Sequence, residues 1–275
     1  MKILVTGATG FIGNYVVEEL LKNKYQVVCV IRDEKKLDSF AWRSKVHIIR
    51  CDLHQGVPDF LCEKLPNVLI HLAWSGLPNY KSLFHLEKNL PADIRFLRTM
   101  VELGVKQILV TGTCFEFGIQ NGPLESEMPT SPHNPYALAK DTLRKWLQEL
   151  QSEKDFILQW VRLFYIYGAG QNTNSILAQL DRAIDSGDTV FNMSGGEQLR
   201  DYLPVEKVAE YITKIVNHPE KQGIYHCCSG KPISIRKLVE AHINNRKANI
   251  KLNLGHYPYN DFEAMEFWGV PSKIE

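Results

Sequence analysis

Short apolar runs alternate with amphipathic stretches along the first 168 residues of the chain. The runs are rich in Val, Ile and Leu, and they cover residues 2–7, 25–32, 46–53, 67–74, 106–113 and 155–168. Strands that are buried on both faces give such continuous apolar runs, and their alternation with helices is typical of crossover units in a parallel sheet. The pattern predicts an α/β fold with a doubly wound parallel sheet.

Between these runs, apolar residues recur at helical spacing over 14–23, 90–104 and 135–151. In the first of these stretches, Val16, Val17 and Leu20 fall on one face of a helix. The spacing therefore predicts the helices that cover the sheet.

The pattern changes after Gly168. Residues 168–188 are rich in loop-forming residues, 205–218 form an amphipathic helix by pattern, and the tail, 260–275, is irregular. We expect a dinucleotide-binding domain at 1–165, to which some later elements return, and a smaller substrate-binding part at 166–275 over the carboxyl edge of the sheet.

Composition excludes several classes of protein. Of 275 residues, 44% are hydrophobic and 23% are charged, and the formal net charge is +1, so no overall field attracts nucleic acid or an anionic membrane. No run of about 18 apolar residues is present, and the first apolar run breaks at Thr6–Gly7, unlike a signal peptide. We expect a cytoplasmic protein without a membrane span.

The cysteine pattern points to reduced, buried thiols. None of the six cysteines forms a C-x-x-C pair, and no Cys/His group has the spacing of zinc ligands. The sequence therefore predicts neither disulfides nor a metal site. The cysteines are Cys29, Cys51, Cys62, Cys114, Cys227 and Cys228.

A glycine-rich loop, VTGATGFIG at 5–13, joins the first predicted strand to the first predicted helix. Glycines permit a tight turn and a close backbone approach, and a helix N-terminus offers free N–H groups to a diphosphate. The alternative is a plain strand-to-helix turn. We expect a Rossmann-type dinucleotide site whose loop contacts come from Gly7, Thr9, Gly10, Phe11, Ile12 and Gly13.

The ends of the following strands would complete that site. The second run ends near Ile31 and offers Arg32, which suits the 2′-phosphate of NADP(H), whereas Asp33 could hydrogen-bond the ribose of NAD(H). His71 is expected to be a packed strand histidine rather than a general base. The third and fourth runs are predicted to contact the cofactor through Asp52, Leu53, Leu72 and Ala73.

Tyr136 and Lys140 lie four residues apart on one predicted helix, so both face the same side. An ammonium beside a phenol favours the phenolate and lowers its pKa, and such a pair can exchange a proton with a carbonyl oxygen while a nicotinamide carries hydride. Thr113, at the end of a strand, could hold the same oxygen. These three residues are the candidate catalytic group.

The motifs together resemble the extended short-chain dehydrogenase/reductase family, the NAD-dependent epimerase/dehydratase group that acts on nucleotide sugars. The resemblance rests on GATGFIG, HLAW, the strand end at Thr113, PYALAK, VRLFYIYGAGQ and GGEQLRDYLPVEKVAEYI, in the family's order over nearly the whole chain. It implies a nucleotide-sugar substrate, with Thr113, Tyr136 and Lys140 as catalytic residues. Lys140 would hold the nicotinamide ribose as well.

The resemblance also implies substrate contacts. Arg200 matches the family's diphosphate-binding arginine. Tyr165 stands where the family usually carries an asparagine that contacts the same diphosphate, which makes it a candidate contact. By the same resemblance we expect a homodimer, formed through the helices at 90–104 and 135–151.

Some motifs of this chain differ from those of the family, and the differences limit which reactions of the family we expect. Sugar dehydratases of this family carry Asp-Glu after the catalytic threonine, whereas Cys114 and Phe115 occupy those positions here, which disfavours dehydration. Arg32 favours NADP(H) and so a reductase, and the short C-terminal part and the tail HYPYNDFEAMEFWG resemble 4-ketoreductases of deoxysugar pathways. This resemblance implies NADPH-dependent reduction of a 4-keto-6-deoxyhexose linked to dTDP or CDP. The alternatives are a 4-epimerase with bound NAD and a non-catalytic NADP-binding regulator, which the intact Tyr136/Lys140 pair disfavours.

Overall fold

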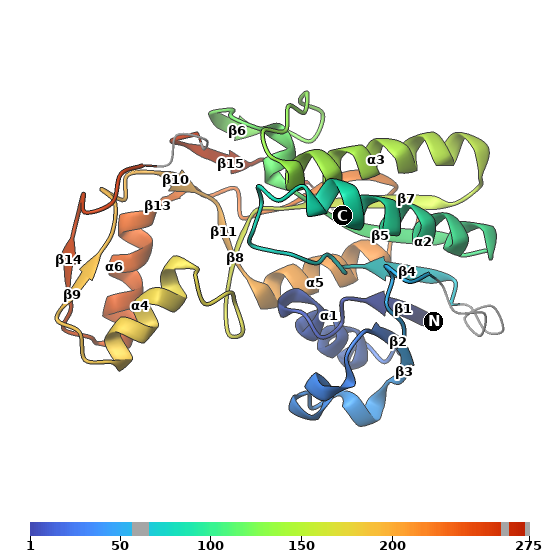
Figure 1. Ribbon diagram of the computed structural model, residues 1–275, viewed down its shortest axis with the longest axis horizontal. Coiled ribbons are helices and arrows are strands. Elements are labelled where there is room, and N and C mark those ends of the chain that lie inside the picture. Colours follow the sequence, from blue (N-terminus) through green and yellow to red (C-terminus); the bar gives the residue numbers. More distant parts are fainter. Residues whose placement is uncertain (57–65, 260–263, 273–275) are drawn as a thin grey trace.

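In the computed structural model, seven parallel strands form one sheet in the larger of two lobes (Figure 1). The structure describes residues 1–56, 66–259 and 264–272. The strand order β12-β7-β5-β4-β1-β2-β3 places the topological switch point between β1 and β4. The strands are β1 (Lys2–Thr6), β2 (Gln26–Ile31), β3 (His47–Arg50), β4 (Val68–His71), β5 (Gln107–Thr113), β7 (Ile157–Leu163) and β12 (Gly223–Cys227).

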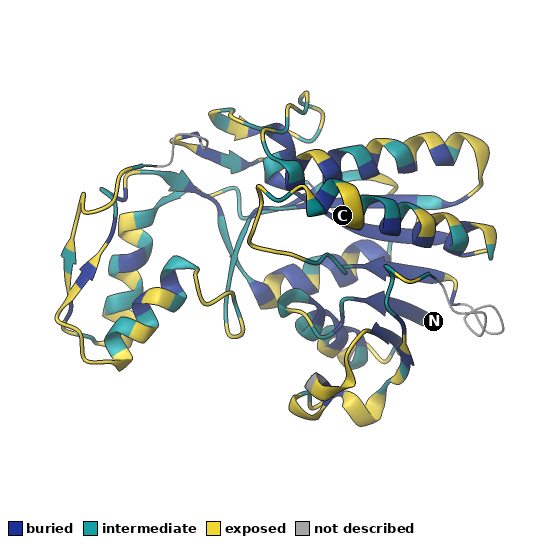
Figure 2. Cartoon of the chain, viewed as in Figure 1, coloured by how far each residue is buried: buried dark blue, intermediate teal, exposed yellow. Residues whose placement is uncertain are grey.

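Helices cover both faces of the sheet. On one face α1 (Phe11–Lys22) packs against α5 (Val205–Val216), and on the other α2 (Leu90–Glu102) packs against α3 (Pro135–Glu153) (Figure 1). Side chains alternate along each strand, so Ile3 and Val5 join the core under α1 and α5, while Leu4 joins the core under α2 and α3. The predicted doubly wound parallel sheet is confirmed, and its central strands are buried (Figure 2).

The smaller lobe consists of short elements around a separate core. Its helices α4 (Ile176–Asp185) and α6 (Ile235–Arg246) pack on each other through Leu180 and Val239, which are fully buried. Its strands pair as β9 (Val190–Asn192) with β14 (Lys251–Asn253) and as β10 (Leu199–Arg200) with β13 (Ile233–Ser234).

Two more strand pairs lie between the lobes (Figure 1). They are β8 (Tyr165–Tyr167) with β11 (Tyr202–Pro204), and β6 (Gly122–Leu124) with β15 (Phe267–Gly269). The short helices are η1 (Glu34–Ser39), η2 (Arg43–Lys45), η5 (Cys114–Phe117) and the π-helix η4 (His85–Asn89).

Two elements from beyond residue 165 belong to the sheet layers. β12 pairs with β7 at the edge of the sheet, and α5 packs on α1. The division into 1–165 and 166–275 remains a prediction about folding units, with α5 and β12 as the elements that return.

Some predicted elements differ from the observed ones. The run at 155–168, predicted as one strand, divides into β7 and β8 at Phe164, whose ring is buried beside Phe267. The stretch 168–188, predicted as loop, contains α4, because Leu177 and Leu180 give it an apolar face behind a Gly- and Asn-rich start.

The described cysteines form no disulfide with one another; four of them are buried and Cys228 is partly exposed. Cys62 lies outside the described residues, as do 260–263 and 273–275 of the predicted irregular tail. No helix in the described part of the chain is long and apolar enough to cross a membrane. Within the same residues, no cluster of His, Cys, Asp or Glu side chains is arranged to hold a metal ion.

Candidate active site

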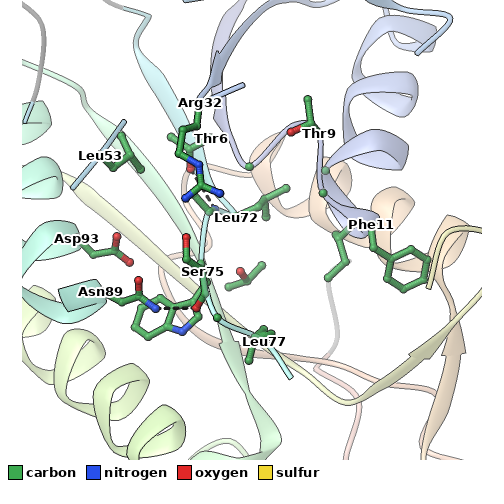
Figure 3. Close-up of a pocket in the computed structure, with 18 of the residues that line it drawn as sticks. Thr6, Thr9, Phe11, Arg32, Leu53, Leu72, Ser75, Leu77, Asn89 and Asp93 are labelled. Atoms are coloured by element: carbon green, nitrogen blue, oxygen red, sulfur yellow. Dashed lines mark hydrogen bonds between the residues drawn. The ribbon is translucent and has the colours of Figure 1, made fainter. Parts of the chain in front are cut away.

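The carboxyl ends of β1, β2, β4 and β5 open into a cavity of about 760 Å³ (Figure 3). Every residue that the sequence predicted to contact the cofactor lines it: Gly7, Thr9, Gly10, Phe11, Ile12, Gly13, Arg32, Asp52, Leu53, Leu72, Ala73, Tyr136 and Lys140. The fold therefore brings the predicted dinucleotide residues and two of the three predicted catalytic residues to one cavity at the switch point.

Backbone contacts require the glycines of the first loop. Gly7 has φ +73°, and a Cβ there would lie 2.7 Å from the backbone nitrogen of Ala73. A Cβ on Gly13 would lie 2.0 Å from the carbonyl oxygen of Gly7. The first turn of α1 faces the cavity through Phe11, Ile12 and Gly13, and its N-cap is Gly10, which has no side chain to cap it. This cradle of backbone N–H groups suits the diphosphate of a dinucleotide.

Arg32 and Asp33, the two residues that follow β2, have different surroundings. Arg32 is exposed and lines the cavity, into which its guanidinium reaches (Figure 3). Asp33 instead accepts a hydrogen bond from the backbone of Lys35 and caps η1, and it is not among the lining residues. The geometry favours Arg32 over Asp33 as the residue beside the adenosine ribose.

Two elements, α3 and β5, bring the catalytic candidates together. Tyr136 and Lys140 come from the first turns of α3, which Asn134 caps by accepting from the backbone of Ala137 at 2.9 Å. Tyr136 is hydrogen-bonded to Thr113, at the end of β5, through their side chains. Lys140 Nζ donates to the carbonyl oxygen of Thr111 at 2.9 Å. The predicted Thr113/Tyr136/Lys140 group is therefore assembled.

Burial decides how these groups titrate. It raises the pKa of Tyr136 well above its ordinary value, with Tyr80 adding to the effect, while the hydrogen bond with Thr113 opposes it. Burial lowers the pKa of Lys140 to about 8, against the opposing charges of Asp93 and Glu116. The net pKa of the phenol is raised because its burial dominates; the expected contribution of Lys140 remains a prediction. Tyr136 therefore holds its proton near neutrality, as a proton donor does.

Aromatic side chains continue from Tyr136 toward the smaller lobe. We call Tyr80, Phe115, Tyr165, Tyr202 and Phe267 the aromatic wall. The ring of Tyr80 lies between those of Tyr136 and Phe115, with centroid distances of 5.5 Å and 5.3 Å. Phe115 is followed by Tyr165, at 6.2 Å. The ring of Tyr165 in turn lies 5.3 Å from that of Tyr202 and 6.0 Å from that of Phe267. One side of Tyr136 is thus lined by aromatic rings of this wall, of which only that of Tyr80 also lines the cavity.

The predicted substrate contacts Thr113, Tyr165 and Arg200 do not line the cavity itself. Arg200 is 3% exposed, and its guanidinium lies 4.5 Å above the ring of Phe267. It donates to the carbonyl oxygens of Leu199 and Met265, and to the Tyr165 hydroxyl at 3.3 Å. In this structure Arg200 therefore braces the aromatic wall, and its contact with a diphosphate remains a prediction.

Glu116, whose direction the sequence did not predict, points into the protein interior. It is fully buried and accepts hydrogen bonds from the backbone of Thr113 at 2.9 Å, from Trp160 at 3.1 Å and from Arg162 at 2.7 Å. These bonds fix the end of β5, and no carboxylate stands at the positions after Thr113 that would serve a dehydratase.

The cavity also has lining residues that the sequence did not reveal, among them Trp74, Tyr80, Asn89 and Asp93. Asp93 Oδ2 lies 3.1 Å from His71 Nε2, and His71 Nδ1 lies 2.9 Å from the Thr6 hydroxyl. His71 is fully buried, as expected of a packed strand histidine. An acidic residue inside the amphipathic stretch at 90–104, one helical turn after Asn89, was the available signal for Asp93.

A known protein family matches most of the chain. The family described as "NAD dependent epimerase/dehydratase family" matches residues 3–228. A dTDP-6-deoxy-L-talose 4-dehydrogenase (NAD(+)) of Aggregatibacter actinomycetemcomitans is 34% identical over 98% of this chain and 100% of its own length. UDP-arabinose 4-epimerase 1 of Arabidopsis thaliana is 24% identical over 99% of this chain and 73% of its own length.

Among solved structures, a UDP-glucose-4-epimerase from Stenotrophomonas maltophila, with bound NAD and formylated UDP-arabinopyranose, has a TM-score of 0.86. The match covers 98% of this chain and 89% of that one at 18% identity, so it shows a shared fold. A UDP-glucose 4-epimerase from Thermus thermophilus, in complex with NAD, gives a TM-score of 0.81 at 20% identity, covering 98% of this chain and 91% of that one.

Proposed function

The chain belongs to the NAD dependent epimerase/dehydratase family, and from that premise we propose that it reduces the 4-keto group of a nucleotide-linked 4-keto-6-deoxyhexose. The product is the 4-hydroxy sugar, and dTDP or CDP carries the sugar. This is a reaction of deoxysugar biosynthesis.

One observation carries the proposal: the buried Tyr136 lines the same cavity as the glycine cradle. Tyr136 is hydrogen-bonded to Thr113, and it shares its cavity with Lys140 and with the predicted diphosphate cradle. A group that keeps its proton at neutral pH is suited to protonating a carbonyl oxygen as it gains negative charge.

The residues would act as follows. When bound, the dinucleotide supplies the hydride that sugar C4 accepts. Tyr136 donates its phenolic proton to O4, so that the carbonyl becomes a secondary alcohol. Thr113 holds O4 in line with that proton, and the Lys140 ammonium stabilises the phenolate until a proton returns from water.

The substrate class follows from two considerations. The relative at 34% identity is named for 4-dehydrogenation of a dTDP-linked 6-deoxyhexose, which is 4-keto reduction run backwards. In addition, the ring of Tyr80, which packs on Tyr136, and the ring of Phe115, which packs on Tyr80, would offer an aromatic surface to the methyl group at C6.

The cofactor proposal has two parts. The talose 4-dehydrogenase relative is named for NAD(+), and the Thermus thermophilus epimerase structure holds NAD, so a nicotinamide dinucleotide as such agrees with both. A preference for NADP(H) over NAD(H) rests on Arg32 alone, through pairing of its guanidinium with the 2′-phosphate.

A 4-epimerase with bound NAD is the second candidate. The observation in its favour is the similarity to UDP-arabinose 4-epimerase 1 over 99% of this chain. An epimerase returns the hydride to the same sugar, so it works without added cofactor, whereas a reductase consumes it.

We also propose a homodimer through the outer surfaces of α2 and α3. Leu138, on α3, and Leu83, just before η4, are large apolar side chains exposed at 43% and 58%. Light scattering of the purified protein should give twice the mass of one chain, and the mass of one chain would exclude the dimer.

The test of the function is cofactor oxidation with a panel of dTDP- and CDP-linked 4-keto-6-deoxyhexoses. We expect at least one member to consume NADPH or NADH in equal amount with the 4-hydroxy product. If no member consumes the cofactor and UDP-hexoses are interconverted without added cofactor, the epimerase replaces the reductase.

A further inference from the structure

Trp74 stands at the centre of the catalytic group. It follows β4 and lines the cavity, and its ring face lies 4.0 Å from Nζ of Lys140. The same indole meets the ring of Tyr136 edge-to-face, with centroids 5.9 Å apart. One side chain therefore contacts both members of the Tyr136/Lys140 pair.

A hydrogen bond to His85 orients the indole. Trp74 Nε1 donates to His85 Nδ1 at 3.1 Å, and the two rings stack at 22°. On the other side of the imidazole, Nε2 lies 2.8 Å from the carbonyl oxygen of Asn79, which can only accept. These partners assign the neutral tautomer with the proton on Nε2, since Nδ1 needs a lone pair to accept from Trp74.

The π-helix η4 puts these groups in place. His85 and Asn89 are its first and last residues, and both are buried. Asn89 Nδ2 donates to the carbonyl oxygen of Ser75, next to Trp74, at 2.8 Å, and lies 3.3 Å from His85 Nδ1. A π-helix is rare and most often marks a functional site. Here the π-helix holds the segment after β4 at two points, since His85 binds the indole of Trp74 and Asn89 binds the carbonyl oxygen of Ser75.

We propose that Trp74 is a positioning residue that holds the Lys140 ammonium beside Tyr136 through the face of its indole, and that His85 aims the indole. The inference rests on the proposed function for its catalytic meaning, while the contact itself does not depend on that function. The catalytic roles proposed for Thr113, Tyr136 and Lys140 do not by themselves require a tryptophan at position 74.

The contact between the Trp74 indole and Lys140 stabilises the charged form of the lysine. Burial lowers the pKa of Lys140 to about 8, so holding the cation is costly near neutrality. The negative face of an indole attracts an ammonium and offsets part of that cost. The other groups that act on Lys140 are Asp93, from α2, and Glu116, from η5, which both raise its pKa; Tyr136 stays protonated.

Fluorination of the indole tests the contact without changing its size much. The protein is made with 5-fluorotryptophan and with 5,7-difluorotryptophan, which weaken the negative ring face stepwise. The pKa of Lys140 is then read by competitive labelling with trace acetic anhydride and mass spectrometry, which needs neither substrate nor turnover. We expect the pKa to fall by about half a unit across the series.

A Trp74→Phe variant in the same fluorinated media is the matched control, since it keeps the other four tryptophans. Its Lys140 pKa should not depend on fluorination. A Lys140 pKa that is constant across the series in the unsubstituted protein would overturn the proposal, and so would an equal dependence in the Trp74→Phe background.

The part played by His85 is tested separately. His85→Gln keeps an acceptor for the indole N–H and a donor for the Asn79 carbonyl, so Lys140 should titrate as in the original protein. His85→Phe loses both bonds, and the pKa of Lys140 should then move. Equal titration in the two variants would remove His85 from the proposal.

The high-pH limb of kcat, measured on the same proteins, links the contact to catalysis and should follow the pKa of Lys140. If no 4-keto sugar is reduced but fluorination still shifts the Lys140 titration, the proposed function fails and the positioning contact stands. If reduction is found and the titration does not shift, the positioning role fails alone.

Discussion

The glycine cradle and the aromatic wall, which meet at the cavity through Tyr80, are built in different ways. The cradle is backbone, made by nine consecutive residues, 5–13, that join β1 to α1. The wall is side chains, contributed by five segments between Tyr80 and Phe267 that only the folded chain brings together. On the proposed function, the cradle would hold the dinucleotide and the wall would meet the sugar.

The two regions should therefore fail differently when they are altered. In the cradle, a methyl group added at Gly7 or Gly13 would lie 2.7 Å or 2.0 Å from main-chain atoms, so we expect either change to prevent cofactor binding. In the wall, rings pack on neighbouring rings, so a single change should alter the choice of sugar more than the chemistry.

The largest effect is expected from Gly13→Ala. Its Cβ would lie 2.0 Å from the Gly7 carbonyl oxygen, whereas a Cβ on Gly10 would meet that atom at 3.1 Å. Gly13→Ala should lower the melting temperature and abolish dinucleotide binding, and Gly10→Ala should leave the melting temperature nearly unchanged. Calorimetry and fluorescence titration measure both quantities. Equal melting temperatures for the two variants would refute the steric account of the cradle.

The next largest effect should come from Tyr136, where the two regions meet. Tyr136→Phe removes the proton donor and keeps the ring, so kcat should fall by about 10²- to 10⁴-fold while dinucleotide binding is unchanged. Tyr80→Phe, on the neighbouring ring of the wall, is the matched control and should lose far less. Retained turnover in Tyr136→Phe would end its role as proton donor.

In the cofactor site, Arg32→Ala tests whether the protein prefers NADP(H) to NAD(H). Loss of a charged hydrogen bond to the 2′-phosphate should lower kcat/KM for NADPH by about tenfold to a hundredfold, while NADH, which lacks that phosphate, is little affected. Steady-state kinetics with both cofactors measure the ratio. An equal loss for both would leave no basis for a preference for NADP(H).

On the sugar side, Phe115→Ser replaces the ring that packs between Tyr80 and Tyr165 with a hydroxyl group. We expect the preference for a 6-deoxyhexose over the parent hexose of the same configuration to fall by about tenfold, mainly in kcat/KM. Cofactor binding should be unchanged. A preference unaltered by the substitution would mean that this part of the wall does not meet C6.

The smallest effect is a gain in stability. Burial lowers the pKa of Lys140 to about 8 from its ordinary value of 10.5, so the charged form is less stable in the folded protein. That cost is fully present below about pH 8 and disappears as the pH rises toward 10.5, because only the unfolded chain holds the proton in that interval.

Lys140→Met should therefore raise the melting temperature by a few degrees at pH 7, while activity is lost, and the gain should shrink toward pH 10.5. Thermal melts of both proteins at matched pH measure the difference. A gain that does not depend on pH would mean that the charge of Lys140 is not its source.

The same contrast explains what the sequence could predict. The cradle, the strand ends and the Tyr136/Lys140 pair follow from local rules, since a glycine after a strand and an i, i+4 spacing mean the same in any chain of this fold. All of the predicted cofactor residues reached one cavity for that reason.

The features of the site that the sequence did not predict depend on contacts between segments that are distant along the chain. Trp74 was noticed only as the end of HLAW, because its partners, Lys140 and His85, come from α3 and from a π-helix without a recognised sequence signature. Arg200 matched a motif, but its burial against Phe267 depends on a strand from the end of the chain. Desolvation reversed the expected pKa shift of Tyr136, because spacing does not reveal burial.

Tyr136 and a bound dinucleotide, on this account, together reduce a sugar carbonyl at C4. The most direct test incubates the protein with NADPH or NADH deuterated at the transferable position and with the active nucleotide-linked 4-keto-6-deoxyhexose, and locates the deuterium by NMR. We predict one deuterium per product at C4, with one cofactor oxidised, and no such product from Tyr136→Phe. Product that lacks deuterium at C4, or turnover of UDP-hexoses without cofactor consumption, would contradict the account.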